Sequence, residues 1–164
     1  MLRNLEIMDT TLRDGEQTSG VSYSPNEKLT IAKLLLEELN VDRIEVASAR
    51  VSDGELNSVK QITNWAKEND YLNKVEVLTF LDNGVSINWL SESGAKVQNL
   101  LTKGSFNHLK YQIRKTPKEH FNDVYNSVYE ARKLNIDTNV YLEDWSNGMR
   151  NSPDYVFDYL DFLS

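Results

Sequence analysis

Short apolar runs alternate along this chain with longer segments whose apolar residues recur at helical spacing. The short runs have the length of buried strands, and the longer segments have the length of amphipathic helices. The predicted strands are 5–9, 43–48, 74–80, 95–101 and 136–142. The predicted helices are 24–40, 53–70, 84–94, 116–135 and 152–164. The pattern therefore predicts five successive strand–helix units, with no segment that resembles a linker.

Local signals mark where several of these helices begin. Ser24 is a typical N-cap, Pro25 occupies the first helical position, and Glu27 completes a capping box. Proline at the first helical position recurs at Pro117. The Asn83-Gly84 dipeptide predicts a turn before the third helix.

Strict alternation of strands and helices predicts an α/β fold with a parallel sheet, either doubly wound or a (β/α)8 TIM barrel. The turn after the first strand has only Gly15 and Gly20, so it matches neither the dinucleotide-binding nor the P-loop glycine pattern. A nucleotide-binding Rossmann domain is therefore disfavoured. Both remaining architectures place function at the carboxyl ends of the strands.

Composition narrows the function classes. The chain has 164 residues, 40% hydrophobic and 26% charged, which is typical of one soluble globular domain. Its formal charge is −7 and its basic residues are scattered, so we expect no nucleic-acid partner. We expect no membrane association and a cytoplasmic location, because there is no apolar run near the roughly 20 residues of a bilayer span and no signal peptide. Without cysteine, any metal must bind oxygen or imidazole ligands.

Polar residues gather at the predicted strand ends. Residues 13–17 follow the first strand, Glu45 lies within the second, Ser105 and His108 follow the fourth, and 143–150 follow the fifth. Acidic residues beside an arginine at such a position indicate a hard divalent cation and an oxyanion.

Four segments resemble the 2-isopropylmalate synthase family, which includes citramalate and homocitrate synthases and, more distantly, 3-hydroxy-3-methylglutaryl-CoA lyases. The first, "DTTLRDGEQTSGVSYSPNEKLTIAKLL", is long and specific; the others are looser. These are "RIEVASARVS", "VQNLLTKGSFNHL" and "NVYLEDWSNGMRNSP". The resemblance implies a TIM barrel that condenses acetyl-CoA with a 2-keto acid, as in leucine and branched-chain amino-acid biosynthesis.

The resemblance also implies roles for individual residues. Asp14 would bind a divalent metal (Mg²⁺, Mn²⁺ or Zn²⁺), Arg13 would stabilise the developing oxyanion, and Glu45 would orient that arginine. Glu143 would contact the keto acid or transfer a proton. The residues expected at the substrate mouth are Gln17, Ser105, His108, Tyr141 and Asp144.

Two features depart from the family pattern. The family takes further metal ligands from a His-x-His motif, whereas this chain has only His108 and His120. The chain also contains about the first five βα units of a barrel, which leaves the fifth strand with an unpaired edge. We therefore expect residues 1–164 to be the amino-terminal part of one catalytic barrel domain, inactive alone and homodimeric as the whole enzyme.

Tyr141 bears on the substrate. Residues two apart on a strand share a face, so Tyr141 should point into the barrel beside Glu143, where isopropylmalate synthases commonly carry a smaller residue. A bulky ring would shorten the pocket and make pyruvate, hence citramalate formation, a competitor of 2-oxoisovalerate. Leu78 and Leu100 could compensate.

Each assignment has a simpler alternative. Arg13 and Asp14 could form only an ion pair, Glu143 and Asp144 could cap a helix, and His108 could cap a loop. His120 is expected at the surface or half-buried. The aromatic stripes are expected to pack on the sheet; they contain Trp65, Tyr125, Tyr129, Tyr155 and Phe162. At the level of the whole protein, the alternatives are an inactive remnant or interaction module, homocitrate synthesis, and lyase chemistry.

Overall fold

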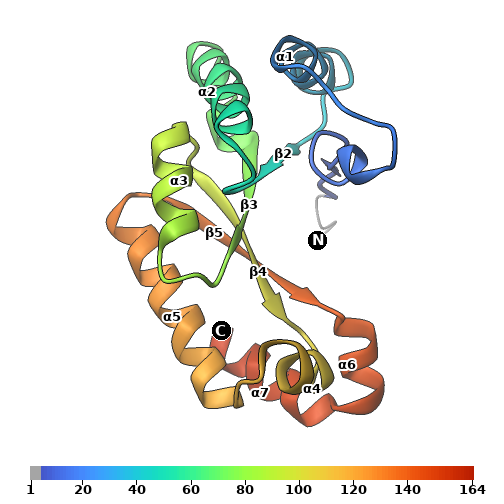
Figure 1. The fold of residues 1–164 in the computed structure, drawn as a ribbon, viewed down its shortest axis with the longest axis vertical. Helices are drawn as coiled ribbons and strands as arrows, with labels where there is room; N and C mark the ends of the chain where they lie inside the picture. The colour runs from blue at the N-terminus through green and yellow to red at the C-terminus, as the bar shows by residue number, and fades with distance from the viewer. Residues whose placement is uncertain (1–4) are drawn as a thin grey trace.

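A single sheet of five parallel strands forms the centre of the computed structural model, which describes residues 5–164. The strands lie side by side in chain order, as expected when each crossover returns to the neighbouring position. Figure 1 shows the strands at the centre of the molecule with the helices around them. They are β1 (Met8–Asp9), β2 (Arg43–Ser48), β3 (Val75–Phe80), β4 (Val97–Lys103) and β5 (Asp137–Glu143). All five predicted strands are present, and the order is that of a partial barrel.

Helices connect every pair of strands. The long connecting helices are α1 (Pro25–Lys33), α2 (Asp53–Glu68), α3 (Val85–Ser93) and α5 (Pro117–Lys133). After β5 come α6 (Trp145–Asn151) and α7 (Pro153–Leu163). Short helical turns complete the connections: η1 (Gly15–Gln17), η2 (Leu34–Glu38), η3 (Leu72–Lys74), α4 (Phe106–His108) and η4 (Leu109–Ile113). None of the helices in 5–164 combines the length and the apolar character needed to cross a membrane.

The predicted helix starts are confirmed. Ser24 and Glu27 form a reciprocal capping box with Pro25 in the first turn, and α5 also has proline in its first turn. The predicted helix 24–40 is less regular, because its α-helical part ends at Lys33 and a π-helical turn follows. The first strand is shorter than predicted, since Leu5 and Ile7 are 86% and 57% exposed and only two residues pair.

The main core lies between the sheet and its first helices. Ile44, Val46 and Val77 are fully buried there with Ile62 of α2 and Leu90 of α3. Burial of such side chains is the chief favourable contribution to folding. A second cluster joins Leu100 of β4, Val124 of α5 and Tyr159 of α7. These contacts define one face of the sheet as the helix-covered face.

A buried amide side chain links three neighbouring strands on the helix-covered face. Thr79 donates a hydrogen bond of 2.9 Å to Gln98 Oε1, and Gln98 Nε2 donates one of 2.8 Å to Thr138 Oγ1. Gln98 is fully buried, so these bonds satisfy an amide that would otherwise be destabilising. The next residue, Asn99, points to the opposite face, which carries the candidate site.

The aromatic stripes only partly follow the prediction. Trp65 packs against the core and Tyr155 is buried, as expected. Tyr125 and Tyr129 are instead 59% and 50% exposed and stack on each other along α5 with ring centroids 6.2 Å apart. Phe162 is 39% exposed but stacks on another aromatic ring. The prediction was wrong for the two tyrosines, which lie on the solvent side of their helix.

Candidate active site

The turn after β1 aims Arg13 at the sheet. The backbone N–H groups of Arg13, Asp14 and Gly15 all donate to the Thr10 carbonyl, at 3.1, 2.8 and 3.2 Å. Leu12, 1% exposed, anchors the turn in the core. The tight turn leaves the Arg13 side chain beside Glu45 of β2.

Arg13 forms two ion pairs. Its Nε contacts Glu45 on β2, and its terminal nitrogen lies 2.8 Å from Asp14 Oδ1. Glu45 is fully buried between Ile44 and Val46, so it needs such a partner. The Arg13–Glu45 pair expected from the sequence is therefore present.

A second donor holds Glu45 from the other side. Asn99 on β4 donates from Nδ2 to Glu45 Oε1 at 2.7 Å, and its own Oδ1 accepts from Asn139 of β5 at 3.0 Å. Asn99 is fully buried. Four elements thus share one polar network, and both oxygens of Glu45 have donors. Asn99 was not among the predicted site residues, although an amide on a predicted central strand is the kind of residue that signals such a network.

Glu76 of β3 is a second buried carboxyl on this face. It is 1% exposed, its Oε1 lies 3.3 Å from Arg43, and its Oε2 has no hydrogen-bond partner within residues 5–164. Burial raises the pKa of Glu76 above its usual value, and nearby Glu45 acts in the same direction. The nearby Asn99 amide and Arg43 act in the opposite direction and offset only part of that effect on the pKa.

Tyr141 spans the opening of the curved sheet. Its hydroxyl on β5 lies 3.6 Å from the Met8 sulfur on β1, the other edge of the sheet. Burial, together with the charges of Glu45 and Glu76, raises the pKa of Tyr141, which is neutral at physiological pH. The Tyr141 phenol is therefore a neutral group that lies beside the Glu45 and Glu76 carboxyl groups on the inner face.

The structure corrects one expected pocket residue. Leu100 faces the helices, where it packs with Val124 and Tyr159, so it cannot compensate for Tyr141. Leu101 is the residue paired with Tyr141, and both line an open cavity of about 610 Å³ at the β5 edge. The sequence alone left the face of this Leu-Leu pair undecided because both residues are apolar.

Ser105, His108 and Asp144 meet at the ends of β4 and β5. Ser105 donates to Asp144 Oδ2 at 2.7 Å, and His108 Nε2 lies 3.4 Å from the same oxygen. Hydrogen bonds from Ser105 and Asn147 lower the pKa of Asp144. Because Ser105 donates to the carboxylate and not to the imidazole, this is not the geometry of a serine nucleophile.

Glu143 pairs with a lysine that the sequence analysis did not single out. Lys103 occupies the matching position on β4, and its ammonium forms an ion pair with Glu143. The Lys103 carbonyl also accepts a 2.7 Å hydrogen bond from Tyr155. Glu143 remains 39% exposed, and it lines the open cavity at the β5 edge together with Tyr141 and Leu101.

The described residues supply one plausible ligand for a divalent metal, and not a complete site. Asp14 is 60% exposed, and one of its oxygens is engaged by Arg13. No group of three His, Cys, Asp or Glu side chains with metal-binding spacing occurs within 5–164. Gln17 is exposed near Arg13 and lines a neighbouring cavity of about 320 Å³.

His120 lies in the core, contrary to the prediction from the sequence. It is fully buried, where the sequence suggested a surface or half-buried position, and its ring lies 5.3 Å from that of Tyr159. Its Nε2 accepts a 3.3 Å hydrogen bond from the Lys103 backbone. Burial lowers the pKa of His120 to about 4, so the imidazole is neutral. It is a core residue that supports the end of β4.

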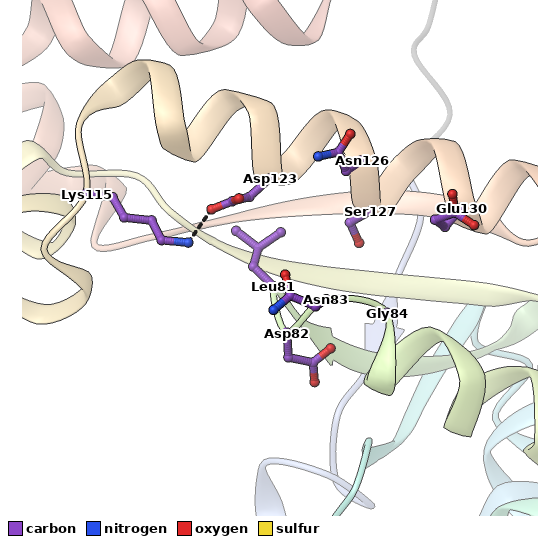
Figure 2. Close-up of a pocket in the computed structure, with 9 residues that line it drawn as sticks. All are labelled: Leu81, Asp82, Asn83, Gly84, Lys115, Asp123, Asn126, Ser127 and Glu130. Carbon is purple, nitrogen blue, oxygen red and sulfur yellow. Dashed lines mark hydrogen bonds and ion pairs between the residues drawn. The ribbon is translucent and has the colours of Figure 1, made fainter.

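One well-formed cavity lies away from this network. It has a volume of about 270 Å³ and lies between the loop after β3 and helix α5 (Figure 2). Its acidic side chains are already engaged, because Asp123 pairs with Lys115 and Asp82 lies 2.5 Å from Arg50. The strand-end network is therefore the stronger candidate for chemistry.

Comparisons with known proteins identify the proteins that this chain is similar to. Residues 4–159 match the family model described as HMGL-like. The chain is 39% identical over 140 residues to the (R)-citramalate synthase of Methanocaldococcus jannaschii, covering 85% of this chain and 27% of that protein. It is 36% identical over 144 residues to the 2-isopropylmalate synthase of Pyrococcus furiosus, covering 88% and 28%. The chain thus spans less than a third of the length of these relatives.

Solved structures support the fold. An HMG-CoA lyase from Acinetobacter baumannii, determined in complex with coenzyme A and 3-methylmalate, matches with a TM-score of 0.62 at 19% identity. The match covers 96% of this chain and 52% of the lyase chain. The Bacillus subtilis HMG-CoA lyase gives a TM-score of 0.55 at 21% identity, covering 84% and 45%.

Proposed function

This chain belongs to the HMGL-like family, and from that premise we propose that it forms the amino-terminal part of a single barrel domain that condenses acetyl-CoA with a 2-keto acid. The single observation that carries the proposal is the Arg13–Glu45–Asn99 network on the inner face of the sheet, whose arginine lies in the turn that follows the carboxyl end of β1. It holds one fixed positive charge where barrel enzymes bind their substrates. The synthase names of the two curated relatives support the reaction class.

In the proposed reaction, a base removes a proton from the acetyl methyl group and the resulting carbanion forms a bond to the keto carbon. Water then cleaves the thioester and releases the CoA thiol. Arg13 stabilises the negative charge that develops on the keto oxygen, and Glu45 with Asn99 fixes the direction of the guanidinium. Glu143 faces the mouth from β5, where it contacts the keto acid or carries a proton.

The family chemistry uses a divalent metal, which would polarise the keto group when bound. In this chain Asp14 would supply one carboxylate oxygen, and further ligands would have to come from outside the described residues. We therefore expect the 164-residue chain to be inactive by itself. We further propose a cytoplasmic homodimer as the working form of the whole enzyme.

The preferred keto acid is argued from Tyr141 and Leu101. Their side chains share the inner face, and the phenol reaches as far as Met8 on β1. This arrangement shortens the space beyond the keto group, which favours pyruvate over the branched 2-oxoisovalerate. Citramalate formation is accordingly the first candidate and 2-isopropylmalate formation the second.

A chimeric enzyme tests the proposal. Residues 1–164 would replace the matching segment of the Methanocaldococcus jannaschii citramalate synthase, and release of CoA thiol would be measured with pyruvate, 2-oxoisovalerate and 2-oxoglutarate. We expect metal-dependent release with pyruvate that falls by about 10²–10³ in Arg13→Met and is unchanged in the surface variant Lys60→Met.

The isolated 164-residue chain and the parent enzyme would be assayed alongside. A folded chimera that is silent while the parent is active would contradict the proposed function and favour an inactive remnant or interaction module. Preference for 2-oxoglutarate would identify a homocitrate synthase. Cleavage of 3-hydroxy-3-methylglutaryl-CoA without condensation would identify a lyase. Turnover by the isolated chain would show that its metal site is complete.

A further inference from the structure

A buried lysine joins the β1–α1 loop to two helices. Lys28 of α1 is 1% exposed, yet its ammonium lies 2.5 Å from Glu16 Oε2 and 2.5 Å from Glu55 Oε1. Glu16 belongs to the loop and Glu55 to the first turn of α2. A buried ammonium is strongly unfavourable without charged partners, and here it has two from different elements.

Glu16 also fixes the loop that contains it. Its other carboxylate oxygen, Oε1, accepts a 3.0 Å hydrogen bond from the Tyr23 backbone N–H. The carboxylate thus bridges the loop internally and attaches it to Lys28. Glu16 directly follows the turn in which three N–H groups, including those of Arg13 and Asp14, share the Thr10 carbonyl. A displacement of Glu16 would therefore be passed directly to Arg13 and Asp14.

We propose that Lys28 is a positioning residue, which holds loop 10–23 through Glu16 and thereby sets the direction of Arg13 and Asp14. Glu16 and Glu55 line the same cavity of about 320 Å³ as Arg13, so the ion cluster stands beside the candidate site. Only the catalytic consequence rests on the proposed function; the restraint on the loop does not.

The alternative is that Lys28 merely attaches α1 to α2 through Glu55. Two neutral isosteres separate these roles, and both keep the volume of the side chain. Glu16→Gln removes the negative charge that attracts Lys28 to the loop and leaves the Lys28–Glu55 ion pair. Glu55→Gln removes the charge that pairs with Lys28 from α2 and leaves the Lys28–Glu16 ion pair. Lys60→Met is the matched control, because Lys60 forms an exposed pair with Glu92 between α2 and α3.

Hydrogen exchange of the 164-residue chain, followed by mass spectrometry, is the first measurement. We expect Glu16→Gln to speed exchange of the amides in 11–23 at least tenfold relative to wild type, with the amides of β3 and β4 within twofold. Glu55→Gln should loosen the loop less, and Lys60→Met should leave it unchanged. Equal loosening by the two Gln variants, exchange within twofold of wild type in Glu16→Gln, or a uniform increase over the whole chain would each overturn the proposal.

The chimeric enzyme supplies the second measurement. We expect Glu16→Gln to lower kcat about tenfold with little change in KM for acetyl-CoA, because the arginine is misdirected and the binding surface is intact. A loosened loop with unchanged kcat would overturn the positioning role. If the unsubstituted chimera is itself inactive, the proposed function fails, and the hydrogen-exchange result then decides alone whether Lys28 restrains the loop.

Discussion

Two carboxyl groups on the inner face of the sheet differ in what surrounds them. Glu45 has Arg13 at one oxygen and Asn99 at the other, so both of its oxygens have donors. Glu76 has Arg43 at 3.3 Å and one oxygen without a partner among the described residues. Burial disfavours an ionised carboxylate, and at Glu76 the neighbouring donors offset only part of that effect, so its pKa is raised.

Glu76 should make stability fall as the pH rises. Its pKa is higher in the folded protein than the 4.5 of an ordinary glutamate, so the folded state binds the proton more tightly. Stability is then lost as the pH rises from 4.5 through the folded pKa. We expect Glu76→Gln to be more stable than wild type at pH 7.5, with the difference shrinking toward pH 4, in urea unfolding followed by circular dichroism. A constant difference across that range would contradict the assignment.

His120 should have the opposite effect. Its pKa falls from 6.5 to about 4 in the folded protein, so the unfolded state takes up a proton first as the pH is lowered. The contribution of the neutral imidazole to the free energy of unfolding is fully present above pH 6.5. It decreases by on the order of 3 kcal/mol as the pH falls to 4. We expect His120→Gln to be less stable at pH 7 but to show a flatter loss of stability between pH 6.5 and 4. Thermal unfolding at half-unit pH intervals measures this slope, and an unchanged slope would count against a neutral buried imidazole.

At the scale of elements, a glycine pair brings the ends of β4 and β5 together. A Cβ on Gly148 of α6 would lie 2.0 Å from the Gly104 carbonyl oxygen, and one on Gly104 would lie 2.8 Å from Leu142. Close backbone approach of this kind requires glycine. It places Ser105, next to Gly104, against Asp144, which precedes α6.

Gly148→Ala should push helix α6 away from the backbone at Gly104, which follows β4. The added methyl group meets backbone that cannot yield cheaply, so we expect a loss of more than about 2 kcal/mol in unfolding free energy. Gly54→Ala is the matched control, because its Cβ would meet only Ser52 Oγ at 3.6 Å within a helix. Denaturant unfolding of the two variants compares them, and similar stabilities would show that α6 can shift without penalty.

The elements that could be predicted from the sequence are those specified by local chemistry. The capping box of Ser24 and Glu27 fixed a helix start, and alternation fixed the strands. The π-helical turns, helix α6 and the inward side of Leu101 could not be predicted, because they depend on how neighbouring strands and loops pack. Within the candidate site, the Arg13–Glu45 pair was predicted from the family resemblance, and it agrees with the need of a buried carboxylate for a charged partner. Asn99 and Lys103 were missed because their partners lie on strands distant in the sequence.

At the scale of the whole molecule, one contact joins the two edges of the sheet. Tyr141 on β5 reaches Met8 on β1 across the inner face, at 3.6 Å. β5 is only partly buried along most of its length, as expected for an edge strand. The sheet is thus curved enough to define an inner space although it contains five strands.

Removing the phenol should enlarge that space. We expect Tyr141→Ser in the chimeric enzyme to shift the ratio of kcat/KM for 2-oxoisovalerate over pyruvate upward by about tenfold to a hundredfold, because the two substrates differ only by two methyl groups and a pocket discriminates such small apolar groups by about this range. Tyr111→Ser is a suitable control, since Tyr111 is a 66% exposed residue outside that pocket. Parallel initial-rate measurements with both keto acids provide the test, and an unchanged ratio would remove Tyr141 from the determinants of substrate size.

The adjacent amides Gln98 and Asn99 have a consequence for assembly of the sheet. Gln98 forms hydrogen bonds toward both sides of β4 on the helix-covered face. Asn99 forms hydrogen bonds toward both sides of β4 on the inner face. A slip of β4 by one residue would exchange the faces, break four hydrogen bonds together and place Leu100 among carboxylates. A buried strand with apolar residues on both faces would tolerate such a slip. The amide pair in β4 makes the shifted register unfavourable, so it specifies the alignment of this strand during folding.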